Sequence, residues 1–321
     1  GHGDVEPAHR LRGRHRRGHG RNAAAGHGHD ETLAGGNVAL ARRAGDEWPE
    51  FAERIERLGG GSIEFSKEGA IVVARNALEV GWIDHLAAAC QARGLPVRRL
   101  SGAELKRAEP SITANAPGGL LLQGDRQVDP QQVLLRLAAA LSRSGVALRM
   151  GRSVDRVMVG ADFLMPDGEV FDRILLATGG GAAEVRFVGR KGGALDAGLA
   201  PIVPVKGQML ALAPVNGGPQ HVIHARDVYI APKARWTLVG ATTERGATDT
   251  SVDRAAVEAL RAKAAELAGV LNTAPEISSW AGVRPGTPDN APMIGETGIP
   301  GVYAALGMYR NGVLFAPAVA E

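Results

Sequence analysis

Two runs near the end of the chain decide the fold: WAGVRPGTPDNAPMIG at residues 280–295 and GVYAALGMYRNG at residues 301–312. Residues 277–282 mix apolar and small side chains, so we expect a strand, with Arg284 where that strand gives way to a Pro/Gly loop. An arginine at such a place can offer a planar guanidinium to a carboxylate through two parallel hydrogen bonds. Residues 302–306 form an apolar run, and glycines then open a helix whose positive end can face a phosphate or an electron-rich ring.

The composition is that of a globular protein. The chain has 321 residues, 45% of them hydrophobic and 22% charged, enough for one large domain or two ordinary ones. The single cysteine, Cys90, excludes an internal disulfide and a cysteine-based metal cage, and its apolar surroundings predict burial. No run approaches the roughly 18 apolar residues of a membrane span, and no signal peptide is visible. We therefore expect a cytoplasmic protein with no membrane partner.

The net charge of +3 belongs to the amino end of the chain. The first thirty residues hold six arginines and three acidic residues, and the rest hold 31 basic and 31 acidic residues. Metal binding by His15, His19, His27 and His29 and nucleic-acid binding by the arginines are the weaker alternatives, because no acidic residues orient the histidines and no aromatic residues interleave the arginines. We expect a disordered basic tail at residues 1–21, no metal and no nucleic-acid partner.

Helical and strand patterns alternate along the rest of the chain. Ser101 and Glu104 form a capping box, and Asp129 followed by Pro130 is a good helix start. The Asp167-Gly168 pair predicts a hairpin turn. We expect helices over residues 37–57, 76–93, 101–110, 129–145 and 251–267. We expect strands over residues 63–65, 70–73, 97–100, 119–123, 146–150, 154–159, 228–232 and 237–240.

Three linked motifs resemble a known family. WAGVRPGTPD (residues 280–289), PMIG (residues 292–295) and GMYRNGVL (residues 307–314) are similar to the carboxyl-terminal signature of the FAD-dependent amine and amino-acid oxidases related to D-amino-acid oxidase. Among these the resemblance is greatest to the glycine oxidases of thiamine biosynthesis. The alternative is two strands joined by Pro/Gly turns, with Arg284 and Arg310 as surface charges. The family-like spacing of the three motifs favours the family.

The resemblance implies a substrate site without a catalytic side chain, because the flavin itself accepts the hydride. Arg284 would bind the substrate carboxylate. Tyr229 would also contact this carboxylate, across the flavin face, and Arg310 would close the pocket. The alternative for Tyr229 is a sheet tyrosine with its hydroxyl group in water. A buried phenol needs a polar partner, and a substrate carboxylate can be one.

The resemblance also implies where FAD binds. Residues 22–26 resemble the family's AAAG segment near the flavin, and residues 177–179 resemble an A-T-G turn that passes beside the cofactor. The glycine-containing turn of residues 307–312 would lie against the flavin ring. The predicted cofactor-binding residues are Ala25, Gly26, Val154, Thr178, Gly179, Gly307, Met308, Tyr309, Arg310, Asn311, Gly312 and Val313.

The predicted fold is α/β, with an α+β substrate domain built on an antiparallel sheet. Proteins of this family open with a strand, a G-x-G-x-x-G turn and a helix, and residues 1–21 show none of these. We therefore expect a Rossmann-like FAD-binding domain that lacks its first strand–helix unit. We assign residues 22–60, 120–200 and 282–321 to the FAD-binding domain and residues 61–119 and 201–281 to the substrate domain.

The expected activity is FAD-dependent oxidation of glycine or another small amino acid to an oxo acid, ammonia and hydrogen peroxide, with oxygen as the second substrate and thiamine thiazole synthesis as the setting. A sarcosine or D-amino-acid oxidase is one alternative. A truncated, non-catalytic relative unable to hold FAD is another, motivated by the absent G-x-G-x-x-G turn. A homo-oligomer is compatible with the sequence.

Overall fold

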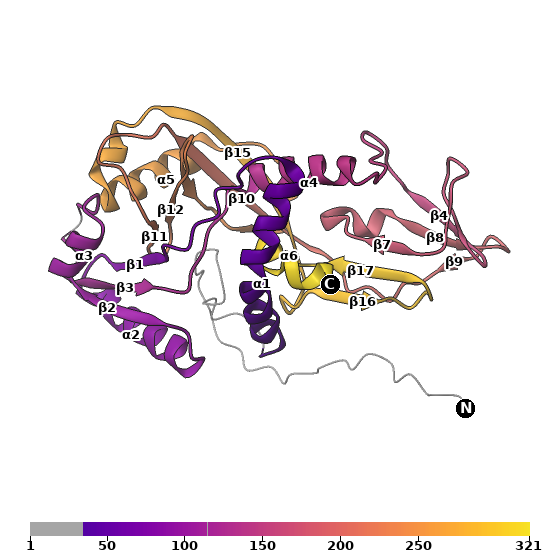
Figure 1. Cartoon of the computed structure of the whole chain (residues 1–321), viewed down its shortest axis with the longest axis horizontal. Coiled ribbons are helices and arrows are strands. Elements are labelled where there is room, and N and C mark those ends of the chain that lie inside the picture. Colours follow the sequence, from indigo (N-terminus) through magenta and orange to yellow (C-terminus); the bar gives the residue numbers. More distant parts are fainter. Residues whose placement is uncertain (1–34, 114) are drawn as a thin grey trace.

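The computed structural model describes residues 35–113 and 115–321, a mixed α/β fold with two lobes and a group of helices between them (Figure 1). The lobe at the left of Figure 1 is built on one large sheet, in the strand order β14-β10-β13-β12-β11-β1-β3-β2, with β15 also paired to β10. Its strands are β1 Ala70–Ala74, β2 Val97–Ser101, β3 Gly118–Leu122, β10 Val203–Leu212, β11 Val222–His224, β12 Tyr229–Pro232, β13 Thr237–Gly240, β14 Glu244–Arg245 and β15 Glu276–Gly286.

This sheet draws strands from both segments that we assigned to the substrate domain, and β3 and β15 cross the predicted limits of those segments. The division into domains itself stays a prediction. The lobe also contains helices, which are α2 Ala77–Ala92, α3 Gly102–Ala108, α5 Arg254–Leu267 and the 3₁₀ turn η2 Gly269–Asn272. The main hydrophobic core of this lobe lies between the sheet and α5, where Leu210, Val239, Leu260 and Leu267 are buried together.

Capping side chains explain where these helices begin. The Asn76 side chain accepts hydrogen bonds from the first backbone N–H groups of α2. Ser101 and Glu104 form both bonds of the predicted capping box at the start of α3. On α2, Cys90 is buried, as predicted. Local sequence therefore fixes these helix starts before any tertiary contact is considered.

The longest ladder in the molecule joins β10 to β15, antiparallel from Val203 opposite Gly286 to Leu212 opposite Glu276. Arg284 lies inside β15, opposite Val205, so our prediction that the strand ends at this arginine is wrong. The strand continues through Pro285 because, among the described residues, β15 pairs only with β10, and an edge strand tolerates proline.

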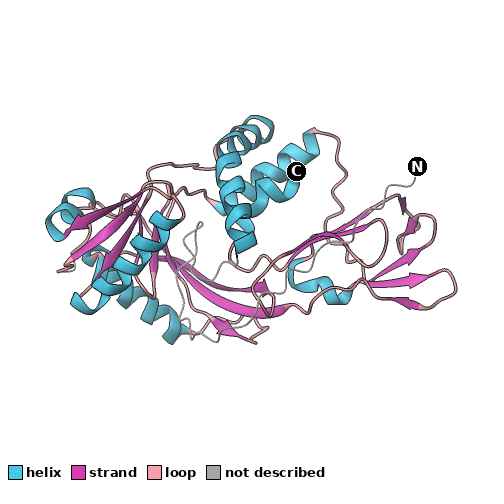
Figure 2. Cartoon of the chain, turned by 90° about the horizontal axis from the view of Figure 1, so that it is seen from below, coloured by secondary structure: helices cyan, strands magenta, loops and turns pink. Residues whose placement is uncertain are grey.

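Three helices lie between the lobes: α1 Gly35–Gly59, α4 Pro130–Arg143 and α6 Gly312–Ala320 (Figure 2). The buried Trp48 of α1 donates from Nε1 to the Leu314 carbonyl of α6 at 3.0 Å. Helix α1 continues through Pro49 without ending. As predicted, α4 starts with Asp129 as the capping residue and Pro130 in the first turn. These contacts bring the beginning of the described chain against its end.

The lobe at the right of Figure 1 contains two smaller sheets. One has the order β16-β17-β7 and the other β6-β5-β4-β8-β9. Their elements are β4 Arg156–Val159, β5 Phe163–Leu164, β6 Val170–Phe171, β7 Ile174–Leu176, the 3₁₀ turn η1 Gly179–Glu184, β8 Arg186–Gly189, β9 Ala194–Leu195, β16 Met293–Glu296 and β17 Val302–Leu306. The predicted turn at Asp167-Gly168 joins β5 to β6.

Strands β7 and β17 run parallel, as in a nucleotide-binding domain. Within residues 35–113 and 115–321, β7 pairs with β17 alone, and its Leu175 is 63% exposed. The described part of this sheet therefore ends in an open apolar edge. Such an edge is where a further parallel strand would pair.

Two predicted strands are absent from the described structure. Residues 63–65 are not a strand, because Glu64 has a φ of 56° and turns the chain out of the extended conformation. Residues 146–150 are also irregular, with Met150 85% exposed, and the predicted strand at 154–159 begins only at Arg156. Apolar residues alone did not make this segment a strand, because no neighbouring strand among the described residues pairs with it.

Candidate functional site

The candidate site lies on one face of the large sheet. Side chains alternate along a strand, and residues opposite each other on paired strands share a face. On β10, Leu210 faces the core beneath α5, so Gly207 and Met209 face the other side. Arg284 shares that other face through its pairing with Val205. The alternation thus separates a core face from a second face that we call the site face.

Tyr229 joins the site face through the register of two further strands. Met209 of β10 pairs with Gly240 of β13, and Gly240 pairs with Tyr229 of β12. The predicted substrate residues Tyr229 and Arg284, far apart in the sequence, therefore lie on the same face of one sheet. The Tyr229 hydroxyl group donates to Met209 Sδ at 3.3 Å.

Arg284 lies across β10 rather than out in solvent. Its Nη1 donates to the Thr242 carbonyl at 3.4 Å. A methyl group placed on Gly207 would be only 2.1 Å from Nη1, so the guanidinium passes directly over this glycine. Burial lowers the pKa of Arg284, and the neighbouring charge of Arg310 lowers it further. The side chain is held, but by weak and neutral groups.

Arg310 reaches the same place from the turn before α6. Burial raises the pKa of the Tyr229 phenol, while the charges of Arg284 and Arg310 pull that pKa down. Such mutual effects require the three groups to lie close together. The structure thus brings together all three predicted substrate residues, two cationic and one phenolic.

The turn of residues 307–312 is fastened to the end of β15. Tyr309 donates its backbone N–H to the Pro285 carbonyl at 2.9 Å. Gly307 has a φ of 70°, and a methyl group on it would lie 2.5 Å from Thr287 Cγ2. The turn also places Met308, Asn311 and Gly312 at the start of α6, as its sequence predicted. The amino end of α6 therefore opens next to the substrate residues.

The A-T-G turn arrives at the same point from β7. Gly179, with a φ of 58°, follows Thr178 at the start of η1, and a methyl group on it would lie 4.0 Å from the ring of Pro285. Three predicted segments, around Gly179, Arg284 and Tyr309, thus meet around Pro285. Val154 is different, because it lies in the loop before β4 and is 41% exposed. Ala25 and Gly26 lie outside the described residues.

The charge of the site is unusual for a folded interior. Among the described residues, Arg284 forms no salt bridge with a carboxylate. Two neighbouring guanidinium groups repel each other, and an anion placed between them would relieve that repulsion. A small carboxylate offers the right charge and can accept two parallel hydrogen bonds from a guanidinium. An anion could therefore bind at this end of the strand pair.

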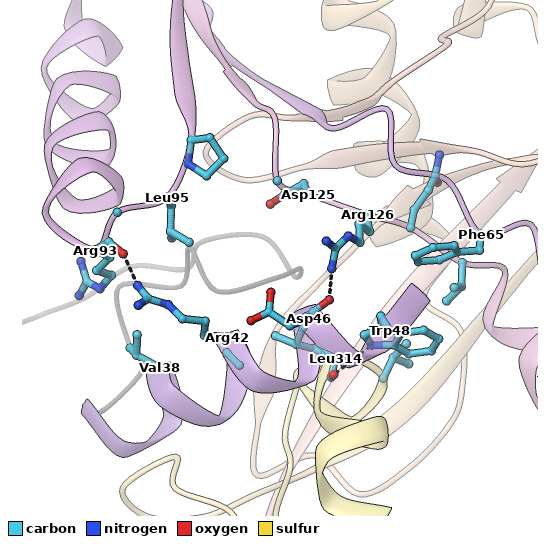
Figure 3. A pocket seen from close by; sticks show the side chains of 18 residues that line it. Val38, Arg42, Asp46, Trp48, Phe65, Arg93, Leu95, Asp125, Arg126 and Leu314 are labelled. Atoms are coloured by element: carbon cyan, nitrogen blue, oxygen red, sulfur yellow. Dashed lines mark hydrogen bonds between the residues drawn. The ribbon is translucent and has the colours of Figure 1, made fainter. Parts of the chain in front are cut away.

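A separate cavity of about 470 Å³ lies between α1, α6 and three loop segments, at Phe65, at residues 93–96 and at residues 124–128 (Figure 3). Arg42 donates to the Arg93 carbonyl and Arg126 to the Gly45 carbonyl at its wall, as the dashed lines show. Of the predicted site residues that the structure describes, Val313 alone lines it. This cavity is therefore distinct from the place where Arg284 and Tyr229 meet.

Sequence reasoning missed the small residues that shape the site. Gly207 and Gly240 lie beneath the Arg284 and Tyr229 side chains, and Thr242 supplies the carbonyl for Arg284. Gly207 ends the P-V-K-G run of residues 204–207, and the role of this glycine depends on the register between β10 and β15. In the described residues no group of three or more His, Cys, Asp or Glu side chains could hold a metal ion. Nor does any described helix have the length and apolarity needed to cross a bilayer.

Fold and site together define a flavin-dependent oxidoreductase, and comparison with known families agrees. The family model described as DAO, FAD dependent oxidoreductase, matches residues 14–321. The chain therefore belongs to this family of FAD-dependent oxidoreductases, as the three motifs indicated.

Individual relatives are glycine oxidases and proteins that contain a related part. The chain is 30% identical over 286 residues to the glycine oxidase of Geobacillus kaustophilus, covering 87% of this chain and 74% of that enzyme. It is 31% identical over 241 residues to the bifunctional protein ThiO/ThiG of Nostoc, covering 70% of this chain and 34% of that protein. The crystal structure of the Geobacillus kaustophilus glycine oxidase superimposes with a TM-score of 0.81 at 28% identity, covering 92% of this chain and 81% of that chain.

FAD is the cofactor of this family, and part of the described structure fits it. The site needs a backbone that approaches a flat ring closely, which the positive φ angles of Gly307 and Tyr309 provide. It also needs hydrogen-bond donors, which the first N–H groups of α6 supply, since Asn311 makes no side-chain cap there. The segment that we expected to lie near the flavin, around Ala25 and Gly26, is outside the described residues.

Proposed function

We propose that this protein uses FAD to oxidise glycine or another small amino acid to an oxo acid, ammonia and hydrogen peroxide. The observation that supports this most is the meeting of Arg284, Tyr229 and Arg310 beside the turn that opens α6. For glycine the overall reaction consumes one oxygen and one water and releases glyoxylate, ammonia and hydrogen peroxide. The resemblance to glycine oxidases further leads us to propose a role in thiamine biosynthesis, in the cytoplasm.

In this proposal Arg284 binds the substrate carboxylate through its two Nη atoms, and Tyr229 donates its hydroxyl hydrogen to the same carboxylate. Binding an anion offsets the repulsion between Arg284 and Arg310, so the site gains most from a negatively charged substrate end. Arg310 closes the pocket from the turn side. Together these groups fix the position of the α-carbon.

When bound, FAD supplies the acceptor for the hydride that leaves the α-carbon. Gly307, Met308, Tyr309, Arg310, Asn311, Gly312 and Val313 would hold its ring at the start of α6, and Thr178 and Gly179 would pass beside it. The positive end of α6 favours negative charge on a ring placed there. No side chain is needed as a base if the substrate amine binds without its extra proton.

A substrate panel tests the proposal. The full chain, purified and supplied with FAD, is assayed for hydrogen peroxide with glycine, sarcosine, D-alanine and L-alanine. Peroxide with glycine, together with bleaching of the flavin absorbance under anaerobic glycine, is expected. A clear preference for sarcosine or D-alanine would move the protein to the corresponding oxidase. A protein that takes up no FAD would contradict the proposal and favour a non-catalytic relative.

A further inference from the structure

We infer that Gly207 is a positioning residue: the space left by its absent side chain is the groove that holds the Arg284 guanidinium in carboxylate-binding position. This inference deepens the proposed function and rests on it for the identity of the ligand. The placement of Arg284 by Gly207 is a statement about the folded protein alone, and it can be tested separately.

The backbone at Gly207 does not need glycine. Gly207 lies in the regular part of the β10–β15 ladder, opposite Gly282, and its φ is not in the left-handed region. An alanine can adopt this extended conformation without strain. The reason for glycine at this position must therefore be sought in the space around it.

That space is filled by one side chain. A carbon added to Gly207 would lie 2.1 Å from Arg284 Nη1, 2.3 Å from Nη2 and 2.4 Å from Cζ, and these are its three nearest neighbours. The near equality of the distances shows that the guanidinium lies directly over the glycine. Since the obstacle is the far end of a long side chain, an alanine would displace Arg284 and leave the sheet intact.

The partners of Arg284 explain why this placement matters. Its hydrogen bond to the Thr242 carbonyl is long, at 3.4 Å, and no carboxylate among the described residues pairs with it. A guanidinium held so weakly takes the position that the surrounding shape allows. The same device recurs at Gly240, where an added carbon would lie 2.4 Å from Met209 Sδ and 2.8 Å from the Tyr229 hydroxyl oxygen.

Gly282 provides a matched reference across the ladder. It is the partner of Gly207 in the register, yet a carbon added to it would meet no atom within 4 Å. The Gly282→Ala change therefore measures what an extra methyl group costs this strand pair without displacing Arg284. The Gly207→Ala change adds the same group where the guanidinium lies.

The direct test observes Arg284 itself. The side-chain Nε–H signal of Arg284 in an NMR spectrum is assigned through its disappearance in Arg284→Ala. Gly207→Ala should shift this signal, whereas Gly282→Ala should leave it in place, with both variants folded by circular dichroism. An unchanged Arg284 signal in folded Gly207→Ala would overturn the inference, whatever the enzyme does.

The functional test is a double-mutant cycle. In the FAD-loaded enzyme, Gly207→Ala should raise KM for glycine by about tenfold or more, with a smaller change in kcat, because a carboxylate contact made throughout the reaction is lost. In the Arg284→Ala background the same change should have no further effect. Additive losses would show that Gly207 acts through another group and would overturn the inference.

The two proposals fail in different ways. If the wild-type protein oxidises no amino acid, the proposed function is wrong, and the NMR comparison still decides whether Gly207 fixes Arg284. If the wild type oxidises glycine and Gly207→Ala does so with the same KM, the inference alone is wrong. Acetate, which carries a carboxylate but no amine, provides a further probe: it should raise the melting temperature of the wild type and not of Gly207→Ala.

Discussion

The two faces of the β10–β15 strand pair each carry a positively charged side chain, and the two side chains differ in their partners. Lys206 points to the core face, where its Nζ meets Asp249 Oδ1 at 2.6 Å and Ser251 Oγ at 3.3 Å. Arg284, one register step away on the site face, has the Thr242 carbonyl at 3.4 Å and a second arginine nearby. On the core face the lysine has a carboxylate partner within the chain. On the site face the arginine has only a neutral carbonyl partner among the described residues, and we propose that a ligand carboxylate pairs with it.

Another buried charge in the same lobe, the Glu109 carboxylate, has a full set of hydrogen-bond partners within the chain. The carboxylate of Glu109 is fully buried and accepts hydrogen bonds from Ser111 Oγ, the His221 ring and three backbone N–H groups, those of Ser111, Gln220 and His221. A charge with this many partners contributes to stability. A charge without them, such as Arg284, is proposed here to contribute to binding instead. Mutations should therefore separate the two kinds of site by what they damage.

The largest expected effect is on catalysis, from Arg284→Ala. Losing the partner of the substrate carboxylate should cost about 2–5 kcal/mol of transition-state stabilisation, seen as a fall in kcat/KM for glycine. The melting temperature should hardly change, because burial and Arg310 already disfavour the charge in the folded protein. Steady-state kinetics and thermal unfolding of the same preparation measure both.

Arg254→Ala is the control for that variant. Arg254 begins α5 and pairs with Glu276 at 2.8 Å, so it is an exposed arginine with a carboxylate partner. Its loss should leave KM for glycine unchanged. Unchanged turnover of Arg284→Ala at low glycine would remove Arg284 from the site and end the contrast between the two faces.

The second effect is on stability, from Glu109→Gln. Burial alone would raise the pKa of Glu109, but its hydrogen bonds, chiefly from His221 and Ser111, outweigh burial and lower the pKa to about 2. Relative to an ordinary value of 4.5, this corresponds to about 3 kcal/mol of stability. That contribution is complete above pH 4.5 and disappears as the pH falls toward 2.

Urea unfolding at several pH values checks this prediction. The pKa of His221 is raised by Glu109, so its share of the stability is complete below its ordinary value of 6.5 and declines as the pH rises through the raised value. The difference in free energy of unfolding between wild type and Glu109→Gln should therefore be largest near pH 5–6 and decrease toward pH 3. Glu258→Gln, on the exposed side of α5, should show no such difference from wild type. A difference for Glu109→Gln that does not depend on pH would refute the idea that the charged carboxylate of Glu109 provides this stability.

The sequence predicted the parts of this molecule that depend on local chemistry. The predicted caps at Ser101 and Asp129 are set by neighbouring residues, and the structure has helices starting at both, as it has at the predicted start at residue 76. Arg284 and Tyr229 were proposed from a resemblance, and the structure places them on one face, although their roles stay predictions. What a sequence pattern does not contain is the register between strands some 80 residues apart, here 203–212 and 276–286.

Register is the reason Gly207 was overlooked. Its importance appears only when Arg284 is known to cross β10 at that position. A similar limit explains the wrong strands, since the backbone of Glu64 turns left-handed and Met150 stays exposed, neither of which alternation of apolar residues reveals. Local sequence determines where the helices begin, whereas contacts between strands distant in the sequence determine which residues meet at the site.

The smallest expected effect comes from Tyr229→Phe, and it sharpens the contrast within the site. The only hydrogen bond that the described structure gives this hydroxyl group is to Met209 Sδ, a weak acceptor, so its removal should cost less than about 1 kcal/mol of stability. If the hydroxyl group also donates to the substrate carboxylate, KM for glycine should rise by about three- to tenfold, well below the effect of Arg284→Ala. Tyr303→Phe, the same change on β17, is the control. An unaltered KM in Tyr229→Phe would leave carboxylate binding to the arginines alone, with Tyr229 acting as an ordinary sheet tyrosine that fills the space beside Gly240.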